Sequence, residues 1–190
     1  MQVIETAIPD VKIFVPTRLA DGRGFFSETY NRRRLAEHGI GANFVQDNLS
    51  YSTRKGTIRG LHFQAPPYAQ IKLVSAVKGA ILDVAVDIRK GSTTFGQYVA
   101  VVLSAEEGNQ LLVPVGFAHG FCTLEPDTQV FYKVTNHYSP AHDKGVYWAD
   151  PDIGIDWPVA ETEAHLSEKD GRLPPLAELP DDFVYESGDA

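Results

Sequence analysis

The chain has 190 residues, a length that suits one globular domain with a substantial core. Its 17 basic and 25 acidic residues give a formal net charge of −8, which argues against a non-specific nucleic-acid or anionic-membrane surface. A single cysteine, Cys122, excludes an internal disulfide and a cysteine-rich zinc site. No apolar run approaches the roughly 20 residues of a membrane span, and residues 1–10 lack the pattern of a signal peptide. These features predict a cytoplasmic protein.

The first 40 residues alternate between strand and turn signals and then favour a short helix. Strand patterns cover 2–6, 11–15 and 24–29, with a turn at Asp21-Gly22 before the third. Asn31 is expected to cap a helix of one to two turns, because its side chain can accept from the first unpaired backbone N–H groups. Gly39 ends the helical pattern, as glycine often does just beyond a helix.

Two strand patterns at 44–52 and 57–64 carry many polar side chains for a sheet. Alternation places Gln46, Asn48 and Ser50 on one face of the first strand. Buried polar groups of this kind need hydrogen-bond partners, and a bound ligand can supply them. The sequence therefore points to a binding surface here.

In the second of these strands, it is open whether Arg59 and His62 face the same side of the sheet. Strict alternation puts Arg59 and His62 on opposite faces, so they share a site only if the strand bulges between them. Gly60 lies between them, and an isolated glycine in a strand often marks a bulge. The alternative is an edge strand with a solvated Arg59 and a core His62 bonded to the backbone.

Charged residues interrupt the apolar strand patterns that follow, at 70–77, 80–88, 97–103, 109–114, 116–124 and 129–135. Lys72 begins one strongly apolar run, where it either extends to the rim or is held for a reason. Asp83 and Asp87 interrupt the next run. His119 lies between two glycines, and a tight turn with a satisfied histidine is the plain alternative to a functional role.

The last part of the chain has few strand signals. Ser167 or Asp170 is expected to cap another short turn. After Arg172 the chain is rich in proline and acidic residues, which predicts a tail over the surface of this molecule or of a partner. About ten short strands with close turns and little helix predict an all-β sandwich or barrel, and not a parallel βα fold.

The residue types restrict the chemistry. The usual ligand pattern of metal-binding β-barrels begins with His-x-His, but His62 is followed by Phe63-Gln64. His62 and His119 without a clear third ligand make a weak site, so we expect no metal. No serine-nucleophile elbow and no glycine-rich phosphate loop occurs in the sequence. The remaining His, Tyr, Lys, Arg and Asp residues form an acid–base set suited to proton transfer next to a carbonyl.

Seven short segments together resemble the dTDP-4-dehydrorhamnose 3,5-epimerase family. Each segment is weak evidence alone, but all seven occur in order and cover nearly the whole chain. They begin with Asp-Gly-Arg-Gly-Phe-Phe-Ser-Glu at 21–28 and include Arg-Gly-Leu-His-Phe-Gln at 59–64. The other segments are 46–48, 70–74, 83–89, 116–121 and 166–170.

The resemblance implies a cupin-type double-stranded β-helix jelly roll, with a few short helices and one domain over residues 1–190. It implies a homodimer that exchanges N-terminal strands, and a reaction without metal or cofactor. The substrate would be a dTDP-4-keto-6-deoxyhexose of deoxysugar biosynthesis, epimerised at carbons 3 and 5 through an enolate. A single-carbon epimerase and a non-catalytic sugar-nucleotide binding cupin are the alternatives. A metal-dependent cupin enzyme is a third.

Site residues follow from the resemblance, position by position. His62 matches the general base, Asp170 the carboxylate that orients it and Tyr132 the acid that returns a proton. Lys72 and His119 match groups around the keto oxygen. At Asp143 the family more often has glutamate, which leaves that contact open. The expected substrate-binding residues are Arg23, Phe26, Glu28, Gln46, Asp47, Asn48, Arg59, His119, Tyr138 as a thymine-stacking ring, Asp143 and Lys169.

Overall fold

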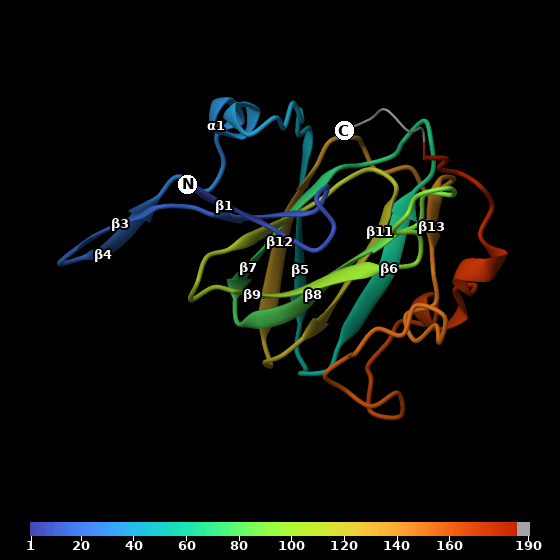
Figure 1. Ribbon diagram of the computed structural model, residues 1–190. Coiled ribbons are helices and arrows are strands. Elements are labelled where there is room, and N and C mark those ends of the chain that lie inside the picture. The colour runs from blue at the N-terminus through green and yellow to red at the C-terminus, as the bar shows by residue number, and fades with distance from the viewer. Residues whose placement is uncertain (186–190) are drawn as a thin grey trace.

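The computed structural model describes residues 1–185, which form two antiparallel β-sheets packed face to face (Figure 1). From residue 46 onward the chain crosses repeatedly between the sheets, which is the connectivity of a jelly roll, so the predicted fold class is confirmed. The six-stranded sheet has the order β1 (Gln2–Glu5), β2 (Lys12–Val15), β10 (Gln110–Val113), β7 (Lys72–Lys78), β12 (Thr128–Val134) and β5 (Gln46–Ser52). The five-stranded sheet has the order β13 (Asp143–Gly145), β6 (Ile58–Gln64), β11 (Phe117–Thr123), β8 (Ala80–Asp87) and β9 (Tyr98–Ser104).

Strands occur at all the expected places, with ends within two residues of those expected. The sequence patterns do not predict two short strands, β3 (Arg18–Asp21) and β13. β13 has only three residues, and its pairing with β6 gives it strand geometry that its own sequence does not demand.

The space between the sheets is closed by apolar side chains from both layers. Val74, Ile81, Phe117 and Val130 come from β7, β8, β11 and β12 and are buried in one cluster. Side chains alternate along a strand, so every second residue of these strands faces the same interior. Several of those interior positions carry polar groups, and these gather around a cavity described below.

The outer face of the five-stranded sheet is covered by the C-terminal part of the chain (Figure 1). Leu61, Phe63 and Val84 pack there against Leu176 and Phe183. Two 3₁₀ turns, η1 (Asp170–Arg172) and η2 (Leu176–Glu178), lie in this segment. The expected tail from about residue 172 is therefore described as far as residue 185, and residues 186–190 lie outside the described residues.

One α-helix, α1 (Arg32–Glu37), occurs in residues 1–185, where the sequence predicts it. The Asn31 side chain accepts hydrogen bonds from the backbone N–H groups of Arg33 and Arg34, so the predicted cap is confirmed. Leu35 anchors the helix in a cluster with Phe14 of β2. No helix of this described part is both long and apolar enough to cross a membrane.

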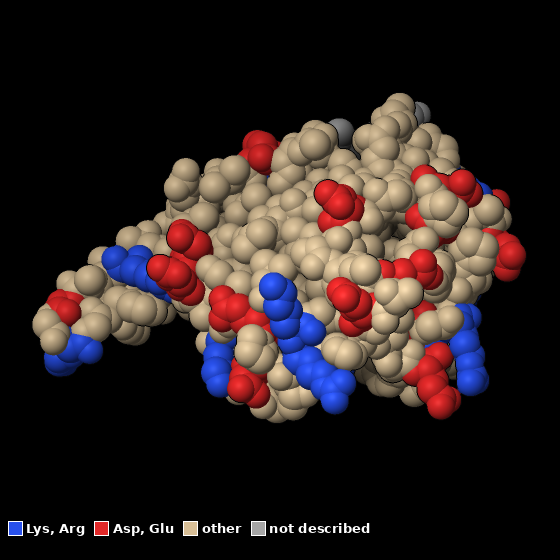
Figure 2. All heavy atoms as spheres, turned by 90° about the horizontal axis from the view of Figure 1, so that it is seen from below, with Lys and Arg blue, Asp and Glu red and all other residues tan. Residues whose placement is uncertain are grey.

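β3 and β4 (Gly24–Ser27) form a hairpin that extends away from both sheets, as Figures 1 and 2 show. We call residues 18–27 the arm. Its large apolar side chains are exposed: Leu19 by 65%, Phe25 by 58% and Phe26 by 70%. A two-stranded hairpin is at best marginally stable alone in water, and exposed apolar side chains mark contact surfaces. The arm therefore presents a surface suited to contact with another molecule.

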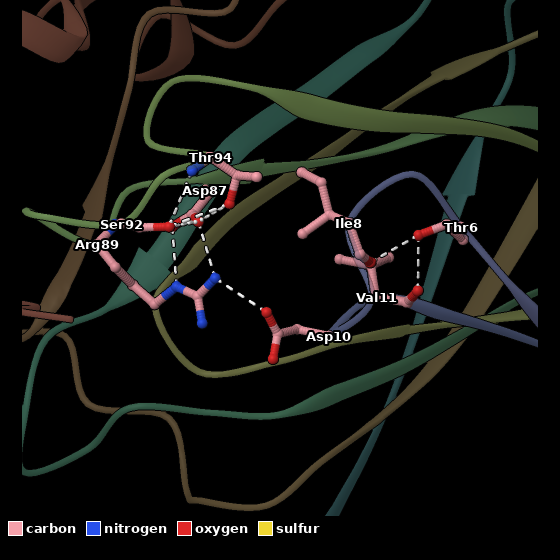
Figure 3. A network of polar contacts seen from close by, with 8 residues as sticks. All are labelled: Thr6, Ile8, Asp10, Val11, Asp87, Arg89, Ser92 and Thr94. Carbon is pink, nitrogen blue, oxygen red and sulfur yellow. Dashed lines mark hydrogen bonds and ion pairs between the residues drawn. The ribbon is translucent and has the colours of Figure 1, made fainter. Parts of the chain in front are cut away.

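A polar cluster around the buried Asp87 joins the end of β8 to the turn after β1 (Figure 3). Asp87 accepts hydrogen bonds of 2.6–2.9 Å from the side chains of Arg89, Ser92 and Thr94. Arg89 also pairs with Asp10 at 3.1 Å. Burial opposes ionisation of Asp87, but these donors outweigh it and hold its pKa below the usual range. We call these five residues the anchor network.

Candidate active site

A cavity of about 500 Å³ lies between the two sheets, and polar side chains from both layers line it. A smaller cavity of about 180 Å³ adjoins it and shares four of its lining residues. We call the two together the site cavity. Eleven of the site residues expected from the sequence line the site cavity. The larger part contains Arg59, His62, Lys72, His119, Tyr132, Lys169 and Asp170, and the smaller part adds Gln46, Asn48, Tyr138 and Asp143.

A bulge at Gly60 brings Arg59 and His62 to the same cavity, as the conflict in alternation predicts. His119 of β11 pairs with His62, whereas Phe121 pairs with Arg59, so the register shifts by one residue between them. Gly60 has φ of 129°, and a Cβ there would lie 2.5 Å from the Gly120 Cα. Only glycine fits this backbone and this contact. β6 also lies between β13 and β11, so the edge-strand alternative is wrong.

His62 is held by a carboxylate from a distant part of the chain. Its Nε2 lies 2.7 Å from Asp170 Oδ1, and Asp170 Oδ2 accepts from the Gly60 N–H at 3.3 Å. Ser167 Oγ accepts from the Asp170 N–H and fixes this turn. Burial raises the pKa of Asp170, but the hydrogen bonds from His62 and Gly60 outweigh burial and leave the pKa below its usual range. An ionised Asp170 accepts Nε2–H, so Nδ1 of His62 carries the free lone pair.

Lys72 is buried in the wall of the cavity and does not extend to the rim. Its side chain is 8% exposed, and Nζ donates to the His62 carbonyl oxygen at 3.1 Å. Burial lowers its pKa to about 8, while the negative charges of Asp83 and Asp143 act in the opposite direction. Of the two interpretations of this lysine, the structure supports the one in which it is held in place.

Tyr132 faces His62 from the other layer, because β12 belongs to the six-stranded sheet and β6 to the five-stranded sheet. Burial raises the pKa of Tyr132, nearby Arg59 lowers it, and Asp143 raises it further, with a net upward shift. The hydroxyl is therefore protonated near neutral pH. It can act as a proton donor within the cavity.

His119 belongs to strand β11 and not to a turn, so the tight-turn alternative is wrong. Its Nε2 lies 2.8 Å from Oδ1 of the fully buried Asp83. Burial lowers the pKa of His119, the Asp83 charge opposes this, and Lys72 and His62 lower the pKa further. His119 is therefore held as a neutral imidazole at neutral pH.

The smaller part of the cavity offers an aromatic ring, and the larger part offers a guanidinium group for an anion. Tyr138 is 57% exposed, its N–H donates to Gln46 Oε1, and its hydroxyl donates to Asp143 at 3.0 Å. Lys169 pairs with the same Asp143 oxygen at 2.5 Å. Arg59 donates to the Ser52 hydroxyl and to the Tyr51 carbonyl, which fixes its guanidinium in the cavity wall. The Asp143 side chain, although shorter than the glutamate more common in the family, thus reaches both Tyr138 and Lys169.

Four expected substrate-binding residues lie outside the cavity of this chain. Arg23, with a side chain 90% exposed, and Phe26 lie on the arm, and Arg23 pairs with Asp21. Glu28 follows the arm and pairs with Arg34 at 3.0 Å. Asp47 lies on the outer face of β5, where it pairs with Lys133, because alternation sends only its neighbours Gln46 and Asn48 inward.

Three residues shape the site without being among the expected catalytic or substrate-binding residues, although the polar strand patterns at 44–52 and 57–64 include Ser50 and Gln64. Asp83 interrupts an apolar run and begins the segment 83–89, but neither signal names a partner or a role for it. Gln64 is buried and binds the backbone of Tyr68, His137 and Ser139, which fixes the loop that carries Tyr138. Ser50 lines the cavity on the inward face of β5. Within residues 1–185, no group of three His, Cys, Asp or Glu side chains is placed to hold a metal ion.

Comparisons with known proteins agree with this geometry. The sequence pattern of the dTDP-4-dehydrorhamnose 3,5-epimerase family matches residues 5–178. The dTDP-4-dehydrorhamnose 3,5-epimerase of Sinorhizobium fredii is 51% identical over 179 residues, which cover 94% of this chain and 91% of the relative.

Two solved structures are also similar. The Bacillus anthracis dTDP-4-dehydrorhamnose 3,5-epimerase with TDP and PPi bound has a TM-score of 0.89 and 53% identity, over 92% of this chain and 98% of that one. The Legionella pneumophila dTDP-6-deoxy-D-glucose-3,5-epimerase in complex with dTDP-4-keto-L-rhamnose has a TM-score of 0.93 and 43% identity, over 98% and 99%. This chain belongs to the dTDP-4-dehydrorhamnose 3,5-epimerase family.

Proposed function

We propose that this protein is an isomerase that epimerises dTDP-4-dehydro-6-deoxy-D-glucose at carbons 3 and 5, giving dTDP-4-dehydro-L-rhamnose. Family membership and the sugar nucleotide bound to the Legionella relative support this substrate. The observation that carries the proposal is the placement of a His–Asp pair and a tyrosine on opposite layers of one cavity. A base and an acid on opposite sides of a sugar ring are what inversion of a carbon requires.

Proton removal is assigned to His62. Hydrogens on carbons 3 and 5 are acidic because both carbons neighbour the ketone at carbon 4. Nδ1 of His62 takes the proton, and the C–H electron pair moves to form an enolate on the keto oxygen. Asp170 holds the ring in the required tautomer and stabilises the imidazolium that results.

Lys72 is assigned to the enolate. Its buried ammonium group lies beside the base, where low dielectric strengthens its attraction for a forming oxyanion. A donor fixed before the reaction starts needs no rearrangement as charge develops. The same group serves both carbons, because both enolates place their charge on the same oxygen.

Tyr132 is assigned to reprotonation. Its hydroxyl gives a proton to the carbon from the side opposite His62, the carbon–hydrogen bond re-forms with inverted configuration, and the enolate returns to a ketone. The raised pKa of Tyr132 keeps this proton in place until the carbanion forms. The imidazolium of His62 and the phenolate of Tyr132 then exchange protons with solvent, which restores the starting state.

Isotope exchange tests this division of labour. His62→Asn is expected to abolish exchange of both ring hydrogens with solvent deuterium. Tyr132→Phe is expected to retain exchange and lose inversion, because the enolate is then reprotonated from the side of His62. Acid–base groups of this kind contribute about 100- to 10,000-fold, which NMR of the sugar product measures directly.

Controls separate chemistry from folding in this test. His38→Asn changes a histidine at the end of α1, outside the cavity, and should leave exchange and inversion unchanged. Both site variants should still bind dTDP by calorimetry. A folded His62→Asn protein that exchanges at the wild-type rate would contradict the mechanism. The same product spectrum tells two inverted carbons from one.

The nucleotide is expected to bind between the body and the arm of a second copy. Arg23 and Phe26 lie on an arm that leaves its own body, with exposed side chains suited to phosphate and to an aromatic base. An arm exchanged within a homodimer brings them to the partner's cavity. Arg59 offers a second guanidinium from the body, and Tyr138 a ring for the thymine.

Mixed dimers test the exchanged arm. A dimer of one Arg23→Ala chain and one His62→Asn chain contains one doubly defective site and one intact site if arms are exchanged. It should recover about half of the wild-type activity, whereas each variant alone is impaired. No recovery on mixing, or a stable monomer at micromolar concentration by sedimentation, would contradict the exchange. Arg59→Ala should weaken dTDP binding in calorimetry without loss of the dimer.

The proposed chemistry uses side chains alone and needs no metal or cofactor. Exhaustive chelation should leave the rate unchanged, and loss of activity that one added divalent metal restores would contradict this. The free Cys122 thiol suits a reducing compartment, and we place the enzyme in the cytoplasm.

A further inference from the structure

Asp83 has an unusual position for a carboxylate. It lies within β8 and is fully buried beside the apolar interior of the sandwich. Oδ1 bonds to His119 Nε2 at 2.8 Å, whereas Oδ2 is buried without a hydrogen-bond partner in residues 1–185. A buried carboxylate costs free energy unless donors and positive charge compensate for it. One hydrogen bond compensates only in part, so stability does not explain this residue.

The contact between Asp83 and His119 is built into the pairing of three strands. β11 lies between β8 and β6, and His119 stands opposite Ala85 on one side and opposite His62 on the other. Asp83 stands opposite Phe121, so it reaches His119 diagonally across the same interior face. Asp83 thereby fixes an imidazole next to the proposed base in the wall of the site cavity.

Asp83 is also the carboxylate left to balance Lys72. Asp83 and Asp143 are the two negative charges that favour the ammonium form of this lysine. Asp143 is already paired with Lys169 at 2.5 Å and bonded to Tyr138, whereas Asp83 retains an oxygen that no group of the described chain pairs with. Besides Asp83 of β8, the titratable groups that line the site cavity around Lys72 come from both sheets and from the C-terminal segment. They are Arg59 and His62 of β6, His119 of β11, Tyr132 of β12, Asp143 of β13, Lys169 and Asp170.

We propose that Asp83 is a positioning residue of the epimerisation, which fixes His119 as the Nε2–H tautomer and keeps Lys72 an ammonium ion beside the forming enolate. This inference rests on the function proposed above. With Nε2–H committed to Asp83, Nδ1 of the neutral His119 is an acceptor suited to a sugar hydroxyl. One buried charge thus prepares two groups that touch the substrate.

Asp83→Asn separates charge from geometry. Asparagine retains an oxygen that accepts Nε2–H of His119 but removes the negative charge. In the wild-type protein, kcat/KM should decline above about pH 8 as Lys72 loses its proton. In Asp83→Asn this alkaline limb should move down by roughly one pH unit, the usual effect of a nearby opposite charge. A folded variant with the wild-type alkaline limb would overturn the proposal.

Asp87→Asn is the matched control, because Asp87 lies on the same strand and face and is equally buried. It should lower the thermal unfolding midpoint and leave the pH profile in place. If both variants shift the alkaline limb alike, the effect is a general loss of structure and the proposal fails. Turnover of the sugar nucleotide by the wild-type protein, measured first, tests the proposed function separately.

NMR of the wild-type protein tests the proposed tautomer of His119 and the charge of Lys72 even if Asp83→Asn does not fold. Long-range ¹H–¹⁵N spectra should show His119 as the Nε2–H tautomer at pH 7, and the labelled Lys72 side chain as an ammonium. An Nδ1–H tautomer of His119, or a neutral Lys72 at pH 7, would overturn the proposal. Asp83→Ala, if it folds, should release His119 into a mixture of tautomers.

Discussion

Asp83 and Asp87 occupy the same face of one strand and are both fully buried, yet their surroundings differ. They are four residues apart, about 13 Å along a strand. Asp87 accepts from three side chains and from the Arg89 N–H within the anchor network. Among the described residues 1–185, the Asp83 carboxylate has one hydrogen bond and one oxygen without a partner.

The difference shows how one strand can serve both structure and chemistry. A buried carboxylate whose partners are complete is locked in one geometry, and its charge is neutralised locally. A buried carboxylate whose partners are incomplete keeps an electrostatic field that acts on its neighbours. We therefore expect changes around Asp87 to alter stability, and changes around Asp83 to alter catalysis.

The largest expected effect is at Lys72, the charged neighbour of Asp83. Lys72→Met should lower kcat by about 100- to 1,000-fold, because the enolate then lacks its fixed positive charge. The thermal unfolding midpoint should change little, since an apolar chain of similar length fills the site. Steady-state turnover and thermal unfolding on the same sample measure both. A Lys72→Met protein with wild-type kcat would remove the lysine from the mechanism.

The next effect is at Arg89, the charged neighbour of Asp87. Arg89→Met leaves Asp87 buried without its cation and should cost about 3–5 kcal/mol of unfolding free energy. The kcat of the remaining folded protein should stay at the wild-type level. Lys133→Met is the control, because its partner Asp47 is largely exposed and such a pair is worth about 0–1 kcal/mol. Equal losses of unfolding free energy for Arg89→Met and Lys133→Met, measured by urea unfolding, would contradict the distinction between the buried and the exposed ion pair.

The smallest expected effect is the pH dependence of the unfolding free energy that Asp87 contributes through the anchor network. The pKa of Asp87 is lower in the folded protein than in the unfolded chain, so its stabilisation is complete above the unfolded pKa of about 3.9 and is lost as pH falls through the folded pKa. The stability gap between wild type and Asp87→Asn should therefore be constant near neutral pH and narrow below about pH 4. Urea unfolding between pH 3 and pH 7 measures the gap. A gap that widens with acidity would contradict the assignment.

Local patterns were enough to predict much of this molecule. Alternation and turn residues predict the strands, and the cap at Asn31 follows from one side chain. The conflict between Arg59 and His62 predicts the bulge at Gly60, because only an extra residue reconciles two polar neighbours with one cavity.

What the patterns miss depends on contacts between distant segments. The role of Asp83 needs His119, 36 residues away, and no local signal names that partner. The direction of the arm is also set by tertiary structure, since Arg18 at its base donates to the carbonyl oxygens of Ala105 and Glu106, far away in the sequence. Asp47 shows the reverse case: its type suits a ligand, but alternation alone would have placed it on the outer face.

The contact between Gly60 and Gly120 has a consequence for how such an enzyme can diversify. A Cβ on Gly120 would lie 2.8 Å from the Arg59 carbonyl oxygen, so neither glycine tolerates even a methyl group. The spacing of the strands that carry His62 and His119 is therefore set by backbone against backbone. Cavity side chains outside the proposed acid–base set can change for another sugar, whereas these two positions stay closed. A library aimed at new substrates gains nothing from varying them.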